Sequence, residues 1–307
     1  MIKNKIVIFG INGWVGKALL DFLHNQLKIP SGDLVLISSS STEISLINGT
    51  KFTCISYEEA LNLPYNNVMF LHLAFKLKDK LSTTTIEEYQ KQNHVIRDKA
   101  KKLIKHFKPA KMVYTSSGAV YDENYDLCKS LKKNPYGYLK IQDEEFFSRL
   151  AKTYNFKILI PRIFNIAGHY INKYNLYAIS DFILQAIQTK KIIINANFPV
   201  IRSYIEIYDL IEIITKWITD NKSNNFIFDT ANTNNLELSD LAELTINTLN
   251  LQANIIRKEI DHNLKSNSYI GNTKNLNILL NKYDIKLKSH STCIKRVYDY
   301  LKLKQEI

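Results

Sequence analysis

The chain has 307 residues, of which 45% are hydrophobic and 23% are charged, a balance that is typical of a globular protein and excludes a largely disordered one. Its three cysteines, Cys54, Cys128 and Cys293, are too widely scattered for a disulfide framework or a C-x-x-C zinc site, and they favour a reducing, cytoplasmic location without a metal. The length exceeds that of one ordinary core and suggests a large α/β domain with a smaller appendage.

The net charge of +12 allows two interpretations, a solvated surface or a funnel for an anionic substrate. The lysines are interleaved with acidic residues and lack an array of aromatic side chains, so we expect no nucleic-acid partner. The first residues lead directly into a short apolar run, without the longer apolar stretch of a signal peptide. No window reaches about 18 uninterrupted apolar residues, so we expect no transmembrane helix and no membrane partner.

The first half of the chain alternates short apolar runs with longer helical periods. Strands are predicted at residues 5–9, 34–38, 52–55, 68–73, 111–115 and 157–160, and helices at 16–26, 86–107 and 135–154. The last helix has Asn134 as its expected N-cap and Pro135 at its first position. This alternation predicts an α/β fold with a doubly wound parallel sheet of the Rossmann type.

Beyond about residue 170 the alternation loosens. Helices are predicted at residues 177–189, 208–221 and 239–249, with short strands at 192–194 and 226–229. No linker rich in Gly, Pro or Ser separates the halves. We therefore predict a Rossmann domain over residues 1–170 and a smaller C-terminal α/β region over 171–307, with segments around 200–232 returning to the first domain.

A glycine turn, Gly10-Ile-Asn12-Gly13-Trp14-Val15-Gly16, follows the first predicted strand and begins the first helix. Glycines at such a turn allow close approach of the backbone to a pyrophosphate, and the helix N-terminus offers unpaired N–H groups and the positive end of its dipole. The spacing is G-x-x-G-x-x-G rather than G-x-G-x-x-G. Its position after the first strand predicts that the Rossmann domain binds NAD(P).

The end of the second predicted strand should contact the adenosine ribose of that cofactor. An Asp or Glu there would bind the 2′-hydroxyl group and repel a 2′-phosphate. This chain has four serines at residues 38–41, including Ser38 and Ser39, and no arginine follows them to hold a phosphate. The segment therefore leans slightly toward NADP, while a plain polar loop is an equally good interpretation.

A tyrosine and a lysine, Tyr136 and Lys140, stand four residues apart on the third predicted helix and so share one face. A phenol with a pKa of about 10 is a poor base at neutral pH, and a neighbouring ammonium group lowers that pKa. The phenol can then exchange a proton with a sugar hydroxyl as hydride leaves the carbon. Lys140 can also hold the nicotinamide ribose. Tyr138 lies close by and provides a false match.

Ser116 and Ser117 follow the fifth predicted strand at the carboxyl edge of the sheet, where ligands bind in such folds. Ser117 can hydrogen-bond to the reacting oxygen and share the proton with Tyr136. The alternative for both serines is capping of the strand end.

Together these motifs resemble the extended short-chain dehydrogenases, and specifically the NAD-dependent epimerase/dehydratase family that acts on nucleotide sugars. Besides the glycine turn, Ser117 and the Tyr136/Lys140 pair, the resemblance includes His72-Leu73-Ala74, Asn93, residues 162–168 (Arg-Ile-Phe-Asn-Ile-Ala-Gly), residues 201–210, residues 232–244 and a terminal helix at 294–301. It covers nearly the whole chain and is specific for the family, but not for a substrate.

The resemblance implies roles for individual residues. The backbone around Trp14 and Val15 would meet the pyrophosphate, and Leu73, Ala74 and Asn93 would lie on the cofactor side. Ser117, Tyr136 and Lys140 would be the catalytic set, with Gly118 beside the substrate. Asn165 and Arg202 would bind the diphosphate of a nucleotide sugar, in the C-terminal substrate-binding region. The resemblance also implies a homodimer. For Arg202 the alternative is a surface ion pair, and for His72 we expect only packing.

The sequence also departs from the family. Dehydratase members carry an Asp-Glu pair after the Ser/Thr, where this chain has Gly118 and Ala119, so we expect no 4,6-dehydration. The interval of 19 residues between Ser117 and Tyr136 is short, and Asp122 replaces a usual glycine.

The first hypothesis for the function is an NAD(P)-dependent epimerase acting through a keto intermediate. The second is an NADPH-dependent keto-sugar reductase or dehydrogenase, and the third is a non-catalytic nicotinamide sensor or nucleic-acid binder.

Overall fold

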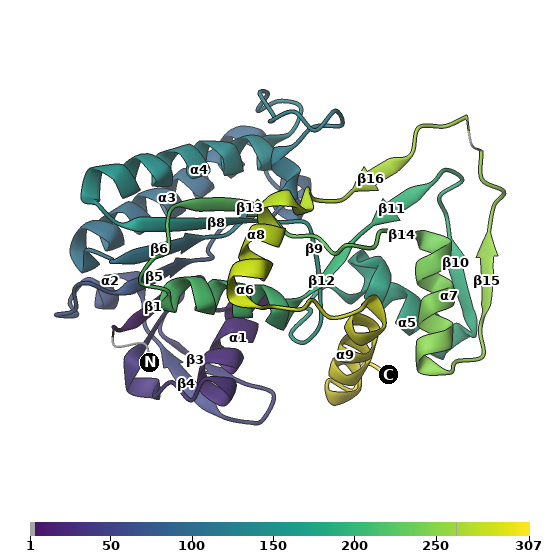
Figure 1. The fold of residues 1–307 in the computed structure, drawn as a ribbon, viewed down its shortest axis with the longest axis horizontal. Helices are drawn as coiled ribbons and strands as arrows, with labels where there is room; N and C mark the ends of the chain where they lie inside the picture. The colour runs from purple at the N-terminus through teal and green to yellow at the C-terminus, as the bar shows by residue number, and fades with distance from the viewer. Residues whose placement is uncertain (1–3, 262) are drawn as a thin grey trace. The chain divides into compact units, whose positions relative to one another are not determined.

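The computed structural model describes residues 4–261 and 263–307, and it divides into two units (Figure 1). The first unit comprises Met1–Ile163 and Ile214–Phe228, and the second comprises Phe164–Ile213 and Asp229–Ile307. The boundary expected at residue 170 lies inside the second unit, and the segment that belongs to the first unit from the later part of the chain is residues 214–228.

The first unit is built on a sheet with seven strands among the described residues. Its order is β13-β8-β6-β5-β1-β2, and β7 also pairs with β8; the strands are β1 (Ile6–Phe9), β2 (Leu34–Ile37), β5 (Met69–His72), β6 (Lys111–Tyr114), β7 (Ser116–Ser117), β8 (Lys157–Ile163) and β13 (Phe226–Asp229). Strands β1, β2, β5, β6 and β8 pair in parallel, for example with Phe9 opposite both Ile37 and His72. The predicted doubly wound parallel α/β fold is confirmed.

The third predicted strand, at residues 52–55, forms but does not join the parallel sheet as a full member. β4 (Lys51–Cys54) pairs antiparallel with β3 (Thr42–Ser45), an additional strand that the sequence did not predict. A single parallel bridge between Ile37 and Ile55 links this hairpin to β2. The alternating burial of β4, with Phe52 and Cys54 inside, is typical of a hairpin with one face in solvent.

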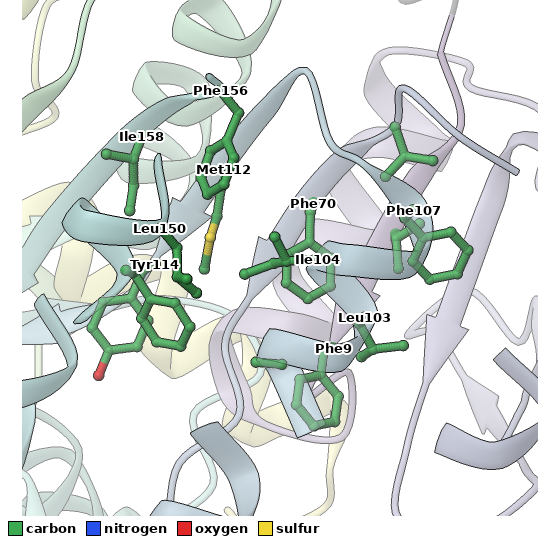
Figure 2. Close-up of a cluster of buried hydrophobic side chains, with 14 of the residues drawn as sticks. Phe9, Phe70, Leu103, Ile104, Phe107, Met112, Tyr114, Leu150, Phe156 and Ile158 are labelled. Carbon is green, nitrogen blue, oxygen red and sulfur yellow. The ribbon is translucent and has the colours of Figure 1, made fainter. Parts of the chain in front are cut away.

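Helices cover both faces of the main sheet. One face packs against α2 (Tyr57–Ala60), α3 (Ile86–Phe107) and α4 (Pro135–Tyr154) through a core that includes Phe70, Leu103 and Phe107 (Figure 2). The other face lies toward α1 (Trp14–Asp21) and the C-terminal end of α6 (Ile207–Thr219) (Figure 1). Each large apolar side chain that is fully buried contributes about 1.5–3 kcal/mol, so this core fixes the sheet edge on which the site depends.

The second unit contains small sheets and four further helices among the described residues. β9 (Asn165–Ala167) pairs parallel with β12 (Tyr204–Glu206), and β10 (Lys191–Ile194) pairs parallel with β15 (Asn254–Arg257). β11 (Val200–Arg202) lies between β14 (Leu236–Glu237) and β16 (Asn267–Tyr269). The helices are α5 (Ala178–Thr189), α7 (Leu238–Leu249), α8 (Thr273–Tyr283) and α9 (His290–Leu303).

Candidate active site

The backbone of the glycine turn is packed so closely that Gly10 and Gly16 leave no room for a side chain. Gly10 has φ +102°, and a Cβ there would lie 2.4 Å from the backbone nitrogen of Ala74. A Cβ on Gly16 would lie 2.5 Å from the carbonyl oxygen of Ile11. Gly13 is the N-cap of α1, without a side-chain capping hydrogen bond and without an acid in the first turn. These features fit a pyrophosphate, because the N–H groups at the helix N-terminus suit an anion.

A cavity of about 610 Å³ opens beside this turn, within the first unit. Of the residues predicted to bind the cofactor, seven line it: Gly10, Asn12, Gly13, Ser38, Ser39, Leu73 and Ala74. Trp14, Val15 and Gly16 form the first turn of α1 and are outside the lining. The cavity therefore follows the carboxyl ends of β1, β2 and β5, where a dinucleotide binds in such folds.

Several lining residues were missed by the sequence analysis. They are Tyr57, Phe75, Lys76 and one face of α3, namely Glu88, Lys91, Gln92, Val95, Ile96 and Lys99. The spacing of three and four residues along α3 was a usable signal, because it places these side chains on one helical face. The apolar pair Val95 and Ile96 gives this wall the mixed character that a nucleotide base needs.

Asn93 does not line the cavity, but its side chain holds the backbone of Lys76, which does. Its side chain is 2% exposed; Oδ1 accepts a hydrogen bond from the backbone N–H of Lys76 at 2.9 Å, and Nδ2 donates to the carbonyl of Tyr89 at 3.0 Å. The Tyr89 hydroxyl donates to the carbonyl of Lys76 at 2.6 Å. Two α3 side chains thus hold the loop that follows β5, so the structure gives Asn93 a supporting position.

The serine segment after β2 folds back on itself. The Ser38 hydroxyl donates to the carbonyl of Ser40, and the Ser41 hydroxyl donates to the carboxylate of Glu59. Glu59 also accepts from the backbone N–H of Ser56 at 2.6 Å, in the capping box of α2. A carboxylate from another element therefore lies beside this loop, although residues 38–41 contain no acid. The lean toward NADP stays a prediction.

The start of α4 is fastened to the turn that follows Ser117. Asn134 caps the helix, since its Oδ1 accepts from the N–H of Gly137 at 2.9 Å, and its Nδ2 donates to the carbonyl of Ala119 at 2.8 Å. A Cβ on Gly137 would lie 1.9 Å from that carbonyl oxygen. The N-cap role expected of Asn134 is confirmed, and the same side chain links the helix of Tyr136 to the turn of Ser117.

Lys140 is 3% exposed, and its ammonium donates to the carbonyl of Thr115, two residues before Ser117, at 2.8 Å. The ammonium nitrogen lies 3.9 Å from the ring centroid of Phe75. The Phe75 ring also meets the ring of Tyr136 edge-on, with 5.6 Å between centroids. The Tyr136 ring, the Lys140 ammonium and the end of β6 therefore gather around Phe75, a lining residue of the cavity.

The two serines after β6 make different contacts. The Ser117 oxygen accepts from the N–H of Ala119 at 3.2 Å and so caps the 3₁₀ turn Gly118–Val120, which is the alternative considered for it. In this contact the Ser117 hydroxyl oxygen is the acceptor. The Ser116 hydroxyl donates instead to Glu144. Ser117 therefore belongs to the turn that Asn134 fastens to the start of α4, whereas Ser116 is bonded to Glu144.

His72 is 1% exposed; its ring stacks on that of Phe9, is tilted against that of Tyr114 and meets Phe147 edge-on. Neither ring nitrogen has a partner among the described residues, and burial lowers its pKa to about 3. Neutral imidazole in an aromatic box is a packing group, as expected.

Asn165 and Arg202 lie in the second unit. The Asn165 amide donates to the carbonyls of Ser203 and Tyr269, each at 3.1 Å, so both its hydrogens join backbone segments. Arg202 is half-buried, and its Nη1 donates to the carbonyls of Ile201 and Asn267 at 2.9 Å each. Among the described residues, its partners are carbonyl groups rather than the carboxylate of a surface ion pair.

Within residues 4–261 and 263–307, no three His, Cys, Asp or Glu side chains are grouped to hold a metal ion. No helix in those ranges is long and apolar enough to cross a membrane.

The parallel sheet, the glycine turn and the Tyr-x-x-x-Lys helix define a Rossmann-type protein of the short-chain dehydrogenase class. The chain belongs to the NAD dependent epimerase/dehydratase family, whose family model matches residues 6–228. The predicted family is confirmed.

The chain is 27% identical over 164 residues to a UDP-glucose 4-epimerase from Mycoplasma genitalium, a match that covers 44% of this chain and 48% of the relative. The match spans about half the length of the curated relatives.

Two solved structures share the fold over nearly the whole chain. The UDP-N-acetylglucosamine 4-epimerase from Methanobrevibacter ruminantium M1, in complex with UDP-N-acetylmuramic acid, has a TM-score of 0.78 at 17% identity and covers 99% of this chain and 100% of that one. RMD from Pseudomonas aeruginosa, complexed with NADPH, has a TM-score of 0.73 at 14% identity, with the same coverage of both chains.

Proposed function

We propose that the protein is an NAD(P)-dependent epimerase that acts on a nucleotide-linked sugar through a transient keto intermediate. The observation that carries the proposal is the gathering of Tyr136 and Lys140 around Phe75, a residue that also lines the 610 Å³ cavity. The phenol proposed for proton transfer therefore contacts a residue that lines the cavity proposed for the cofactor. Family membership and the names of the relatives agree with this reaction.

Tyr136 is the proposed acid and base. Its phenolate takes the proton of the sugar hydroxyl when the carbon is oxidised, and the phenol returns the proton when the carbonyl is reduced on its other face. The nicotinamide, when bound, accepts and returns the hydride. Lys140 stabilises the phenolate by its positive charge, and Ser117 donates a hydrogen bond to the reacting oxygen.

The proposed substrate is a nucleotide sugar, with Arg202 on its diphosphate. The two amide hydrogens of Asn165 go to the carbonyls of Ser203 and Tyr269, so Asn165 holds this part of the backbone rather than the diphosphate. Among the described residues, the hydrogen bonds of the Arg202 guanidinium come from Nη1, which leaves its other N–H groups for an anion. The residues after Ser117 are Gly118 and Ala119, which offer neither an acid nor a base for eliminating water. We therefore propose epimerisation without 4,6-dehydration.

Replacing Tyr136 by phenylalanine tests the proposal. General acid–base groups contribute about 10²–10⁴-fold to rate, so Tyr136→Phe should reduce the interconversion of UDP-glucose and UDP-galactose by that factor, measured by NMR of the sugar. Cofactor binding, measured by fluorescence titration, should remain. Tyr138→Phe removes a phenol two residues further along α4 and is the matched control. Near-normal turnover in Tyr136→Phe would refute the assignment.

A second candidate, an NADPH-dependent keto-sugar reductase, is favoured by the absence of an acid at residues 38–41. The cofactor released from the purified, denatured protein separates the two. NAD⁺ retained near one per chain supports the epimerase, which regains its hydride in each turnover. An empty protein that binds NADPH reversibly and consumes it in proportion to product supports the reductase.

A further inference from the structure

The surroundings of Lys140 oppose the charge that its proposed role needs. Its ammonium lies 3.9 Å from the ring centroid of Phe75 and 4.8 Å from that of Tyr114, and among the described residues it donates a hydrogen bond to the neutral carbonyl of Thr115. Burial lowers the pKa of Lys140, and the carboxylates of Asp143 and Glu144 raise it again. An amine that loses its proton here could no longer stabilise a phenolate at Tyr136.

Two carboxylates follow Lys140 by three and four residues on α4, and one of them is already engaged. Glu144 receives the guanidinium of Arg162 in a two-point contact, at 2.9 Å from Nε to Oε1 and 2.6 Å from Nη2 to Oε2, and it also accepts from Ser116. A charge that is paired so closely with a cation contributes little net field at Lys140.

Asp143 is held differently. It is 4% exposed; its Oδ2 accepts from the Tyr114 hydroxyl at 3.1 Å, and its Oδ1 lies 3.7 Å from Nη1 of Arg97 on α3. The contact with Arg97 is longer than a charge-assisted hydrogen bond. Figure 2 shows Tyr114 at the edge of the apolar cluster, with its hydroxyl directed away from that cluster. The ring of Tyr114 therefore touches Lys140 while its hydroxyl fixes Asp143.

The other charged or titratable groups around this pair come from every neighbouring element. They are Arg97 and Asp98 on α3, His72 on β5, Tyr114 on β6, Arg162 on β8, and Tyr136 and Glu144 on α4. His72 is neutral, and Arg162 is matched by Glu144. Asp143 is thus the one carboxylate in this set that is both buried near Lys140 and not closely paired with an arginine.

We propose that Asp143 is a positioning residue that keeps Lys140 in its ammonium form. It acts through the amine and not on substrate, and its importance for turnover rests on the proposed role of Lys140. With Asp143 ionised, Lys140 stays charged to higher pH; without it, the amine becomes neutral at lower pH, and activity is lost earlier as the pH rises.

The ionisation of Lys140 can be measured without any assay of activity. The full-length protein is labelled with ¹³Cε-lysine, the Lys140 resonance is assigned by its absence in Lys140→Arg, and its pH titration is followed by NMR. Asp143→Asn should lower the pKa of Lys140 by about one unit or more. Asp143→Glu, which keeps the charge, should stay near the parent value. Glu145→Gln removes an exposed carboxylate on the same helix and is the matched control.

The inference would be overturned if the pKa of Lys140 shifted no more in Asp143→Asn than in Glu145→Gln, whatever the activity of the enzyme. If Asp143→Asn does not fold, Asp143→Ser is the second variant without charge. The alkaline limb of the pH–rate profile is then read separately. A shifted Lys140 pKa with an unshifted limb supports the role of Asp143 and argues against the proposed role of Lys140 in catalysis.

Discussion

Gly137 is the point at which the start of α4 touches the turn after Ser117, and Gly137→Ala tests whether this contact positions Tyr136. An alanine Cβ would lie 1.9 Å from the carbonyl oxygen of Ala119, whereas real Cβ contacts stay above 3.0 Å, so the two backbones would have to separate by roughly an ångström. The neighbour is backbone and is held by Asn134, so it cannot rotate away as a flexible side chain would.

Two effects on stability oppose each other. Alanine favours a helix over glycine by about 1 kcal/mol, which predicts stabilisation, whereas overpacking costs about 1–3 kcal/mol. Because the approach is so short, we expect the second effect to dominate, with a net loss of up to about 2 kcal/mol in the free energy of unfolding. Urea denaturation with an unchanged m-value would measure that loss.

The effect on rate should exceed the effect on stability. Separating α4 from the 3₁₀ turn displaces Tyr136 from Ser117, and a misplacement of about 1 Å can cost about 10²-fold in rate. The proposed epimerase activity, measured in the same assay as above, should fall by that factor in Gly137→Ala. Gly32→Ala is the control, since a Cβ there meets nothing within 4 Å. A fully active Gly137→Ala variant of equal or greater stability would refute the reasoning.

Two further predictions concern the cofactor and pH. Ser38→Asp places a carboxylate in the cavity at the end of β2, so the affinity for NADP should fall by about tenfold relative to that for NAD in fluorescence titrations; Ser45→Asp, exposed on β3, is the control, and an equal loss for both cofactors would contradict this. Burial raises the pKa of Glu206 from 4.5 to about 7, and the negative charge of Asp209 is the second largest cause of this rise. The folded state therefore retains a proton that the unfolded state loses, so stability should fall as the pH rises from about 4.5 to 7 and then level off. Thermal unfolding of Glu206→Gln across that range should lack this part of the fall, and an unchanged slope would argue against it.

The features predicted correctly from sequence are those whose signal is local. The glycine turn and the Tyr136/Lys140 spacing lie within single turns of chain, and the apolar runs of β1, β5 and β6 identify buried strands without reference to their partners. The run at residues 52–55 shows the limit of this signal. Its hydrophobicity predicts a strand, but strand pairing depends on distant residues, and it pairs mainly with β3.

The site shows the same division between local and distant information. Asp143 and Tyr114 are separated by 29 residues, and Asn165 and Tyr269 by 104, so no local pattern could join them. Glu59 reaches the loop after β2 through a capping box on another element, which a search for an acid at the strand end cannot find. Tertiary contacts thus decided which polar groups surround the predicted residues.

The charged side chains buried beside the proposed active site cost the folded state desolvation free energy. Lys140, Asp143 and Glu144 are each no more than 5% exposed, and Arg162 joins them from β8. Replacing buried ionic groups by well-packed apolar residues is often neutral or stabilising, so stability alone gives no reason to keep four charges here. A lysine that must stay protonated in an aromatic pocket does give one, because it needs a carboxylate, and that carboxylate needs its own partners in Tyr114 and Arg97. The arrangement is therefore explained better by the proposed proton transfer at Tyr136 than by the stability of the sheet edge on which it is built.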